Sequence, residues 1–132
     1  MLIFGSENEQ SLFSDSVKFK DSKNIENLAG KTNIQELINE IADLDLFITG
    51  DSGPMHIAAA FKVPTVSIFG PTKHIETSQW RNSKSTIIKN NLDCQPCMKR
   101  ECPLKHHNCM ELIKPEKVIR ESLGLLGKIE IN

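Results

Sequence analysis

The sequence predicts an α/β fold in which a parallel sheet is flanked by helices. Short apolar runs, too short for globular helices, alternate with segments in which apolar residues recur at helical spacing. Strands that alternate with helices in this way form parallel sheets with right-handed crossovers. The 132 residues, of which 39% are hydrophobic and 25% charged, suffice for one folded domain over 1–132.

The first quarter of the chain is only weakly patterned. An apolar run at 2–4 predicts a strand that ends at Gly5, and a helical turn or two is expected over 8–14. A short strand is expected near 17–19. The segment 27–31, with Gly30 inside it, has the composition of a turn.

A capping box predicts where the next helix begins. Thr32 is the expected N-cap, and Gln35 stands three residues later, where it can reach back to the cap. Apolar residues then follow at helical spacing, which makes them core residues: Ile34, Leu37, Ile38, Ile41 and Leu44.

The most informative stretch comes next. An apolar run at 46–49 predicts a buried strand, a polar turn spans Gly50 to Gly53, and Pro54 fits the first position of a helix. A strand, a glycine-bracketed turn and a helix together direct free backbone N–H groups at an anion. An ordinary βα corner with a serine cap has the same pattern.

The polar side chains of the turn favour an anion-binding site over an ordinary βα corner. Asp51, Ser52 and His56 fall within six positions at the end of a buried strand, and His56 is expected in the first helical turn. In open α/β sheets, ligands bind at these carboxyl ends of strands. The strand predicted at 65–69 ends in the turn 70–72, at the same sheet edge if the two strands are parallel.

The remaining elements complete the alternation. A long polar loop at 72–85 contains the lone Trp80, and a short strand is expected at 86–88. Pro115 begins a final helix for which Gly127 is a plausible stop. Its predicted apolar face holds four residues: Val118, Ile119, Leu123 and Leu126.

Four cysteines form a separate cluster over 94–109. They are Cys94, Cys97, Cys102 and Cys109, with His106 and His107 within reach. The first pair has the spacing of a metal knuckle, but the later gaps are uneven. A structural zinc site, reduced or disulfide-linked cysteines that brace an irregular loop, and an iron–sulfur site all remain open.

Composition excludes several classes of function. A net charge of −1 predicts no general affinity for nucleic acid, and six Phe, one Trp and no Tyr disfavour a base-stacking platform. No apolar run approaches the length of a membrane span, and no signal peptide is predicted, so a cytoplasmic location is expected. A local basic patch beside the cysteines could face an anionic lipid surface.

Several short motifs in register resemble one enzyme family. They are the segments 51–56, 58–60, 63–64, 69–72, 27–32 and the cysteine cluster. The chain is similar to the C-terminal half of ADP-heptose:lipopolysaccharide heptosyltransferases, which belong to glycosyltransferase family 9. The resemblance spans roughly residues 1–120. It implies a Rossmann-like partial domain of the two-domain GT-B fold, over 1–132, with a cysteine-rich insertion at 94–109.

The resemblance also implies roles for the turn residues. Asp51, Ser52, Gly53 and His56 would hold the diphosphate of ADP-heptose, with His56 donating to a phosphate oxygen. Asp51 would fix the turn by accepting backbone N–H groups, or bind a sugar hydroxyl.

Residues outside the turn are further candidates for the donor pocket. The resemblance implies that Glu7 or Glu9 contacts a donor hydroxyl, that Thr72 lines the same pocket, and that Asn27 and Thr32 lie near the adenosine. Turn chemistry explains Thr72 without a ligand, and helix capping does the same for Thr32.

The expected activity is inverting transfer of heptose from ADP-heptose to the lipopolysaccharide inner core, without a required cofactor. The catalytic carboxylate and the acceptor would belong to an N-terminal domain outside this chain, so no catalytic residue is expected here and the chain alone would be inactive. A sheet without its first strand predicts self-association. Peripheral association with the inner face of the inner membrane is a further expectation. Another nucleotide-sugar GT-B transferase and a non-catalytic zinc-knuckle interaction module are the alternatives.

Overall fold

A computed structural model describes residues 1–14 and 23–128. The chain divides into two compact units, Met1–Glu40 and Ile41–Asn132, which are described separately below. The strand expected near 17–19 lies outside the described residues.

The first unit is built on two short parallel strands. Strand β1 (Leu2–Ile3) pairs with β2 (Glu26–Asn27), so that Leu2 lies opposite Glu26. A 3-10 turn η1 (Glu7–Glu9) and helix α1 (Gln10–Ser14) follow β1 directly. The strand expected at 2–4 and the helical turns expected over 8–14 are therefore confirmed, although the strand is one residue shorter.

The turn predicted over 27–31 is confirmed from residue 28 onward, whereas Asn27 belongs to β2, a strand that was not predicted. The helix cap is not the predicted one. Gly30 has a φ of +70°, a left-handed conformation that glycine adopts without strain. Helix α2 (Ile34–Ala42) begins after Asn33, whose side chain accepts the Glu36 N–H while the Glu36 carboxylate accepts the Asn33 N–H. This capping box lies one residue later than predicted. An asparagine caps as well as a threonine, and a charged Glu36 is a stronger acceptor than Gln35.

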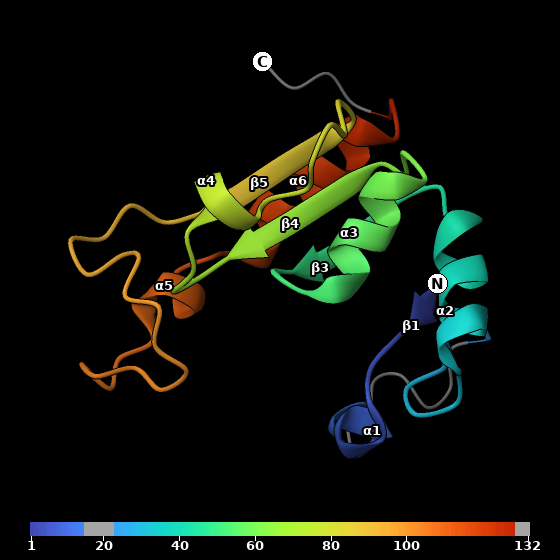
Figure 1. The fold of residues 1–132 in the computed structure, drawn as a ribbon, viewed down its shortest axis with the longest axis horizontal. Coiled ribbons are helices and arrows are strands. Elements are labelled where there is room, and N and C mark those ends of the chain that lie inside the picture. The colour runs from blue at the N-terminus through green and yellow to red at the C-terminus, as the bar shows by residue number, and fades with distance from the viewer. Residues whose placement is uncertain (15–22, 129–132) are drawn as a thin grey trace. The chain divides into compact units, whose positions relative to one another are not determined.

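The second unit contains a three-stranded parallel sheet in the order β3-β4-β5 (Figure 1). Its strands are β3 (Phe47–Gly50), β4 (Thr65–Phe69) and β5 (Ser85–Lys89). Each of the three falls where an apolar or β-branched run predicts it. Gly50 lies opposite Ile68, so the turns after β3 and β4 share one edge of the sheet, as expected.

The central strand β4 is the most deeply buried element. Thr65, Val66 and Ser67 are completely buried. Burial of the two hydroxyls is compatible with the core because each donates a hydrogen bond: Thr65 Oγ1 to the Val63 carbonyl at 2.8 Å, and Ser67 Oγ to Gln79 Oε1 at 3.0 Å. The core around β4 also includes Met55, Ala58, Phe69 and Ile88.

Four helices complete the second unit. They are α3 (Gly53–Ala60), α4 (His74–Thr77), α5 (Asn108–Glu111) and α6 (Pro115–Leu125). Helix α3 contacts β3 and β4, whereas α6 contacts β4 and β5 and passes behind them in Figure 1. The small side chains of Ala58 and Ala59 allow α3 to pack closely on the sheet.

Two details of these helices differ from expectation. The segment 72–85 is not a loop throughout, because α4 interrupts it. In α6, Ile119 is 57% exposed while Ser122 is buried, so the packed face is rotated from the predicted one. The start at Pro115 and the stop at Gly127, which has a φ of +67°, are confirmed.

The predicted fold class is confirmed: both sheets are parallel and helices flank them. Within residues 1–14 and 23–128, no helix combines the length and apolar character needed to span a bilayer.

Candidate functional site

The predicted strand-turn-helix forms as expected, with one shift. Ser52 is the N-cap of α3 in an extended conformation, with φ −154° and ψ 165°. The helix therefore begins at Gly53, and Pro54 occupies its second position rather than its first. Because Pro54 has no N–H and Met55 donates to the Ser52 carbonyl at 3.1 Å, the Gly53 N–H is the outermost donor of the helix.

The space around Gly53 is open. Apart from its two chain neighbours and the backbone of its own helix, a Cβ placed on this glycine would meet no atom of the described residues within 4 Å, and its φ is not left-handed. Glycine is therefore not required here by the fold of the free chain. An approaching ligand is one reason for leaving the position without a side chain.

Ser52 does not cap the helix with its side chain. Its hydroxyl instead lies 3.1 Å from the Thr49 hydroxyl, where either oxygen can donate. Ser52 therefore occupies the N-cap position, but its side chain does not make the hydrogen bond of an ordinary serine cap. Thr49, the last side chain of β3 before the turn, is a contact that sequence reasoning missed, although its position beside the turn was a usable signal.

Asp51 is held by a different partner from the one predicted. Its Oδ2 accepts a hydrogen bond from Thr77 Oγ1 at 2.9 Å, and no backbone N–H of the described residues donates to it. We expected backbone N–H groups to donate to Asp51. Among the described residues the donor is instead the Thr77 hydroxyl of α4, so that expectation is wrong. No sequence signal links residues 26 positions apart in this way.

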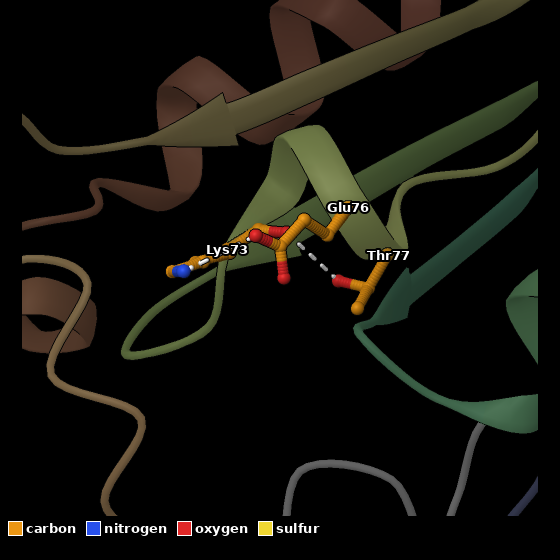
Figure 2. Close-up of polar contacts among 3 residues, drawn as sticks. All are labelled: Lys73, Glu76 and Thr77. Atoms are coloured by element: carbon orange, nitrogen blue, oxygen red, sulfur yellow. Dashed lines mark hydrogen bonds and ion pairs between the residues drawn. The ribbon is translucent and has the colours of Figure 1, made fainter.

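Helix α4 is itself braced by local contacts. Figure 2 shows Lys73, the N-cap of α4, with Glu76 and Thr77 on the single turn of the helix; Lys73 Nζ lies 3.1 Å from Glu76 Oε1. The Thr77 hydroxyl also lies 3.1 Å from the Lys73 carbonyl oxygen. These contacts hold Thr77 on the side of α4 from which it reaches Asp51.

His56 is exposed on the first turn of α3. Within residues 1–14 and 23–128, no hydrogen bond to its ring is present. The ring is therefore available to a ligand, whereas a buried capping histidine, the other explanation for this position, is excluded by its exposure.

Thr72 lines a cavity of about 500 Å³ at the carboxyl ends of β4 and β5. Lys73, His74 and Lys89 line it as well, but no residue of the Asp51–His56 stretch does. The Thr72 hydroxyl oxygen is buried and unpaired in the described part of the chain. Its placement in the donor pocket stays a prediction.

The remaining candidates belong to the first unit. Glu9 accepts hydrogen bonds from both the N–H and the hydroxyl of Ser6, each at 2.7 Å. The Ser6 N–H, followed by the Ser6 hydroxyl, lowers the pKa of Glu9 below its ordinary value. Glu9 thus has a capping role that sequence reasoning missed. The backbone of Glu7 lies against Gly30, and Thr32 precedes the true cap.

None of the four cysteines is part of a disulfide, and all lie between β5 and α6, with Cys109 in α5. All four line one cavity of about 140 Å³, together with His106 and His107. No three His, Cys, Asp or Glu side chains in the described ranges are arranged to hold a metal ion as they stand.

This architecture, a parallel sheet with an open, glycine-flanked helix start at its carboxyl edge, is that of open α/β proteins, which bind their ligands at this edge. Residues 2–108 match the model of glycosyltransferase family 9 (heptosyltransferase). The chain belongs to this family.

Relatives in the family have closely related sequences. The chain is 50% identical over 129 residues to lipooligosaccharide heptosyltransferase 2 of Campylobacter jejuni, with 96% of this chain and 40% of the relative covered. It is 48% identical over 60 residues to lipopolysaccharide heptosyltransferase 3 of Escherichia coli, which covers 46% of this chain and 17% of the relative. The chain thus spans about 40% of the length of the C. jejuni relative.

Solved structures show the same fold. A family 9 glycosyltransferase from Veillonella parvula superposes with a TM-score of 0.76 at 21% identity, over 97% of this chain and 36% of that one. The E. coli ADP-heptose heptosyltransferase II gives a TM-score of 0.70 at 24% identity, over 96% of this chain and 36% of the other.

Proposed function

We propose that this chain is the donor-binding part of a heptosyltransferase that transfers heptose from ADP-heptose to a lipopolysaccharide acceptor. Membership of the family and the heptosyltransferase activity of the relatives support the class of reaction. The observation that supports the site is the open start of α3, where Gly53 leaves room beside the first N–H groups of the helix.

The diphosphate is assigned to residues 52–56. The Gly53 N–H and the positive end of the α3 dipole favour an anion, and the exposed His56 ring can donate to a phosphate oxygen. The Ser52 hydroxyl can donate as well by turning from Thr49. Asp51 does not contact phosphate in this proposal, because like charges repel; its bond to Thr77 fixes the turn.

The proposed reaction is direct displacement at the anomeric carbon. The acceptor hydroxyl attacks that carbon, the bond to the β-phosphate oxygen breaks, and a carboxylate outside this chain takes the hydroxyl proton. Negative charge grows on the departing ADP, so donors that are already oriented at the start of α3 stabilise the transition state more than the ground state. No metal is needed for the residues named here to act.

A pair of glycine variants tests the proposed site. Gly53→Ala adds a methyl group in open space, so the free chain should fold normally while ADP is excluded from the helix start. Gly50→Ala is the matched control, since its Cβ would lie in ordinary contact, 3.9 Å from the Ile68 carbonyl oxygen. Isothermal titration with ADP should show an affinity loss of about 10-fold or more for Gly53→Ala and little change for Gly50→Ala.

Equal affinity of both variants for ADP would contradict the assignment of the diphosphate to this turn. Thermal melts of both variants serve as the folding control. The proposal also includes transfer of heptose to a lipopolysaccharide acceptor and peripheral association with the inner face of the inner membrane.

A further inference from the structure

The cysteine-rich segment forms a structure of its own at one end of the sheet. Figure 1 shows it as a long irregular excursion beyond the carboxyl ends of β4 and β5, closed by α5. The side chains of Cys94, Cys97, Cys102 and Cys109 all line its cavity of about 140 Å³. The proposed transfer reaction uses none of these thiols.

The four cysteines line the same small cavity. Four thiolates formed around one cavity would repel one another. A soft divalent cation among them would turn this repulsion into attraction.

The chain around Cys102 is shaped to hold a thiolate. Lys105 and His107 have left-handed φ values of 59° and 48°. Successive N–H groups in such a turn form a concavity for a negatively charged atom.

The two histidines are engaged elsewhere. The Nε2 atom of His107 accepts the Cys102 N–H at 3.2 Å, and the Nδ1 atom of His106 accepts the Asn108 N–H at 3.0 Å. A neutral ring whose one nitrogen accepts a hydrogen bond carries its proton on the other nitrogen, so neither histidine offers a free lone pair to a metal. The four cysteines are therefore the remaining ligands. Lys99 and Arg100 also line the cavity and can offset the net negative charge of a cation bound by four thiolates.

We propose that Cys94, Cys97, Cys102 and Cys109 bind one zinc ion in a tetrahedral, all-thiolate site. No three ligands in the described ranges are yet arranged to hold an ion, so binding must turn the thiols inward, toward sulfur–zinc distances of about 2.3 Å. Each thiol loses its proton to solvent as it coordinates, and the site then holds the segment in one conformation.

The segment is already tied to the sheet at several points, so a metal there would act as a structural brace. Gln95 Nε2 donates to the Gly70 carbonyl at 2.7 Å, and the Met98 N–H donates to the Pro71 carbonyl at 2.9 Å. A Cβ on Gly70 would lie only 3.6 Å from the Cys109 sulfur. The zinc ion would thus fix the segment against the turn that follows β4.

Metal analysis of the purified chain tests the proposal. After purification with a thiol reductant and exhaustive dialysis, elemental mass spectrometry should find about one zinc ion per chain. Replacement by cobalt should give the thiolate-to-cobalt charge-transfer band and the intense visible bands of a tetrahedral site. Cys97→Ser should lose the bands, whereas the matched variant His106→Gln should keep them.

A measurement on the unaltered chain avoids dependence on variants that could unfold. Alkylation followed by mass spectrometry should find all four thiols protected with zinc and reactive after addition of a strong chelator. Thiols that react equally with and without zinc, or disulfides among the four in the purified chain, would overturn the proposal. So would loss of the cobalt bands in His106→Gln, since it would make an imidazole the ligand.

Discussion

At the scale of single residues, the turn after β3 depends on one long-range contact. Thr77 Oγ1 donates to Asp51 Oδ2 from the single turn of α4. The sequence could place Asp51 at the end of a strand, because the apolar run before it is clear. It could not identify Thr77, because nothing in local periodicity relates two residues that meet only when a short, unpredicted helix forms.

This contact predicts the stability of two threonine variants. Thr77→Val should lower the free energy of unfolding by about 1 kcal/mol, because it leaves a partly buried acceptor without its donor, and Thr77→Ser should restore most of it. Urea denaturation measures both. In an Asp51→Ala background the cost of Thr77→Val should shrink; an unchanged cost would assign the effect to the Lys73 carbonyl contact instead.

Glu9 provides a pH-dependent prediction. Its two hydrogen bonds from Ser6 lower its folded-state pKa below the ordinary 4.5. The capping contact therefore stabilises η1 fully above pH 4.5 and is lost as the pH falls through the lowered value. Side-chain carboxyl shifts followed by NMR should give a titration midpoint for Glu9 below 4.5, and Ser6→Ala should raise it. A midpoint at or above 4.5 in the unaltered chain would contradict the contact.

At the scale of elements, sequence patterns located most strands and helices but not their exact ends. The runs that became β3, β4 and β5 were identifiable because buried parallel strands are continuously apolar or β-branched. Helix caps are decided by competition among neighbouring polar residues. Thr32 was the expected cap, but the Glu36 carboxylate pairs with Asn33 instead.

The cap of α2 can be checked directly by two alanine variants. Asn33→Ala should cost about 1 kcal/mol of stability, since it removes the acceptor for the Glu36 N–H. Thr32→Ala should cost less than half as much. Thermal denaturation followed by circular dichroism measures the stability of both variants. A larger loss of stability for Thr32→Ala than for Asn33→Ala would show that Thr32 is the cap, as the sequence predicted.

At the scale of the whole molecule, the family could be identified from motifs in register, and the fold confirmed it. The donor pocket could not be completed from the sequence. Glu7, Glu9 and Thr32 belong to one compact unit, while Asp51, Ser52, Gly53 and His56 belong to the other. Motif order along the chain gives no distance between such groups, so only Ser52, Gly53 and His56 are assigned here to the diphosphate.

Because the chain is much shorter than its relatives, we expect its binding of ADP to be separable from the transfer of heptose. The chain spans about 40% of the C. jejuni heptosyltransferase, and no residue described here is proposed as the base. We therefore expect the 132-residue chain to bind ADP but not to transfer heptose. Incubation with ADP-heptose and heptose-deficient lipopolysaccharide, followed by mass spectrometry of the acceptor, measures transfer. A full-length family member is the positive control, and product from this chain alone would refute the expectation.

Binding of the donor diphosphate at the open start of α3 can be observed at single residues. Amide NMR spectra of the labelled chain are recorded during titration with ADP and, separately, with adenosine. We expect ADP to shift the Ser52, Gly53 and His56 signals and adenosine to leave them in place. ADP shifts confined to the cavity lined by Thr72, or no shifts at millimolar ADP from a chain whose spectrum is that of a folded protein, would contradict it.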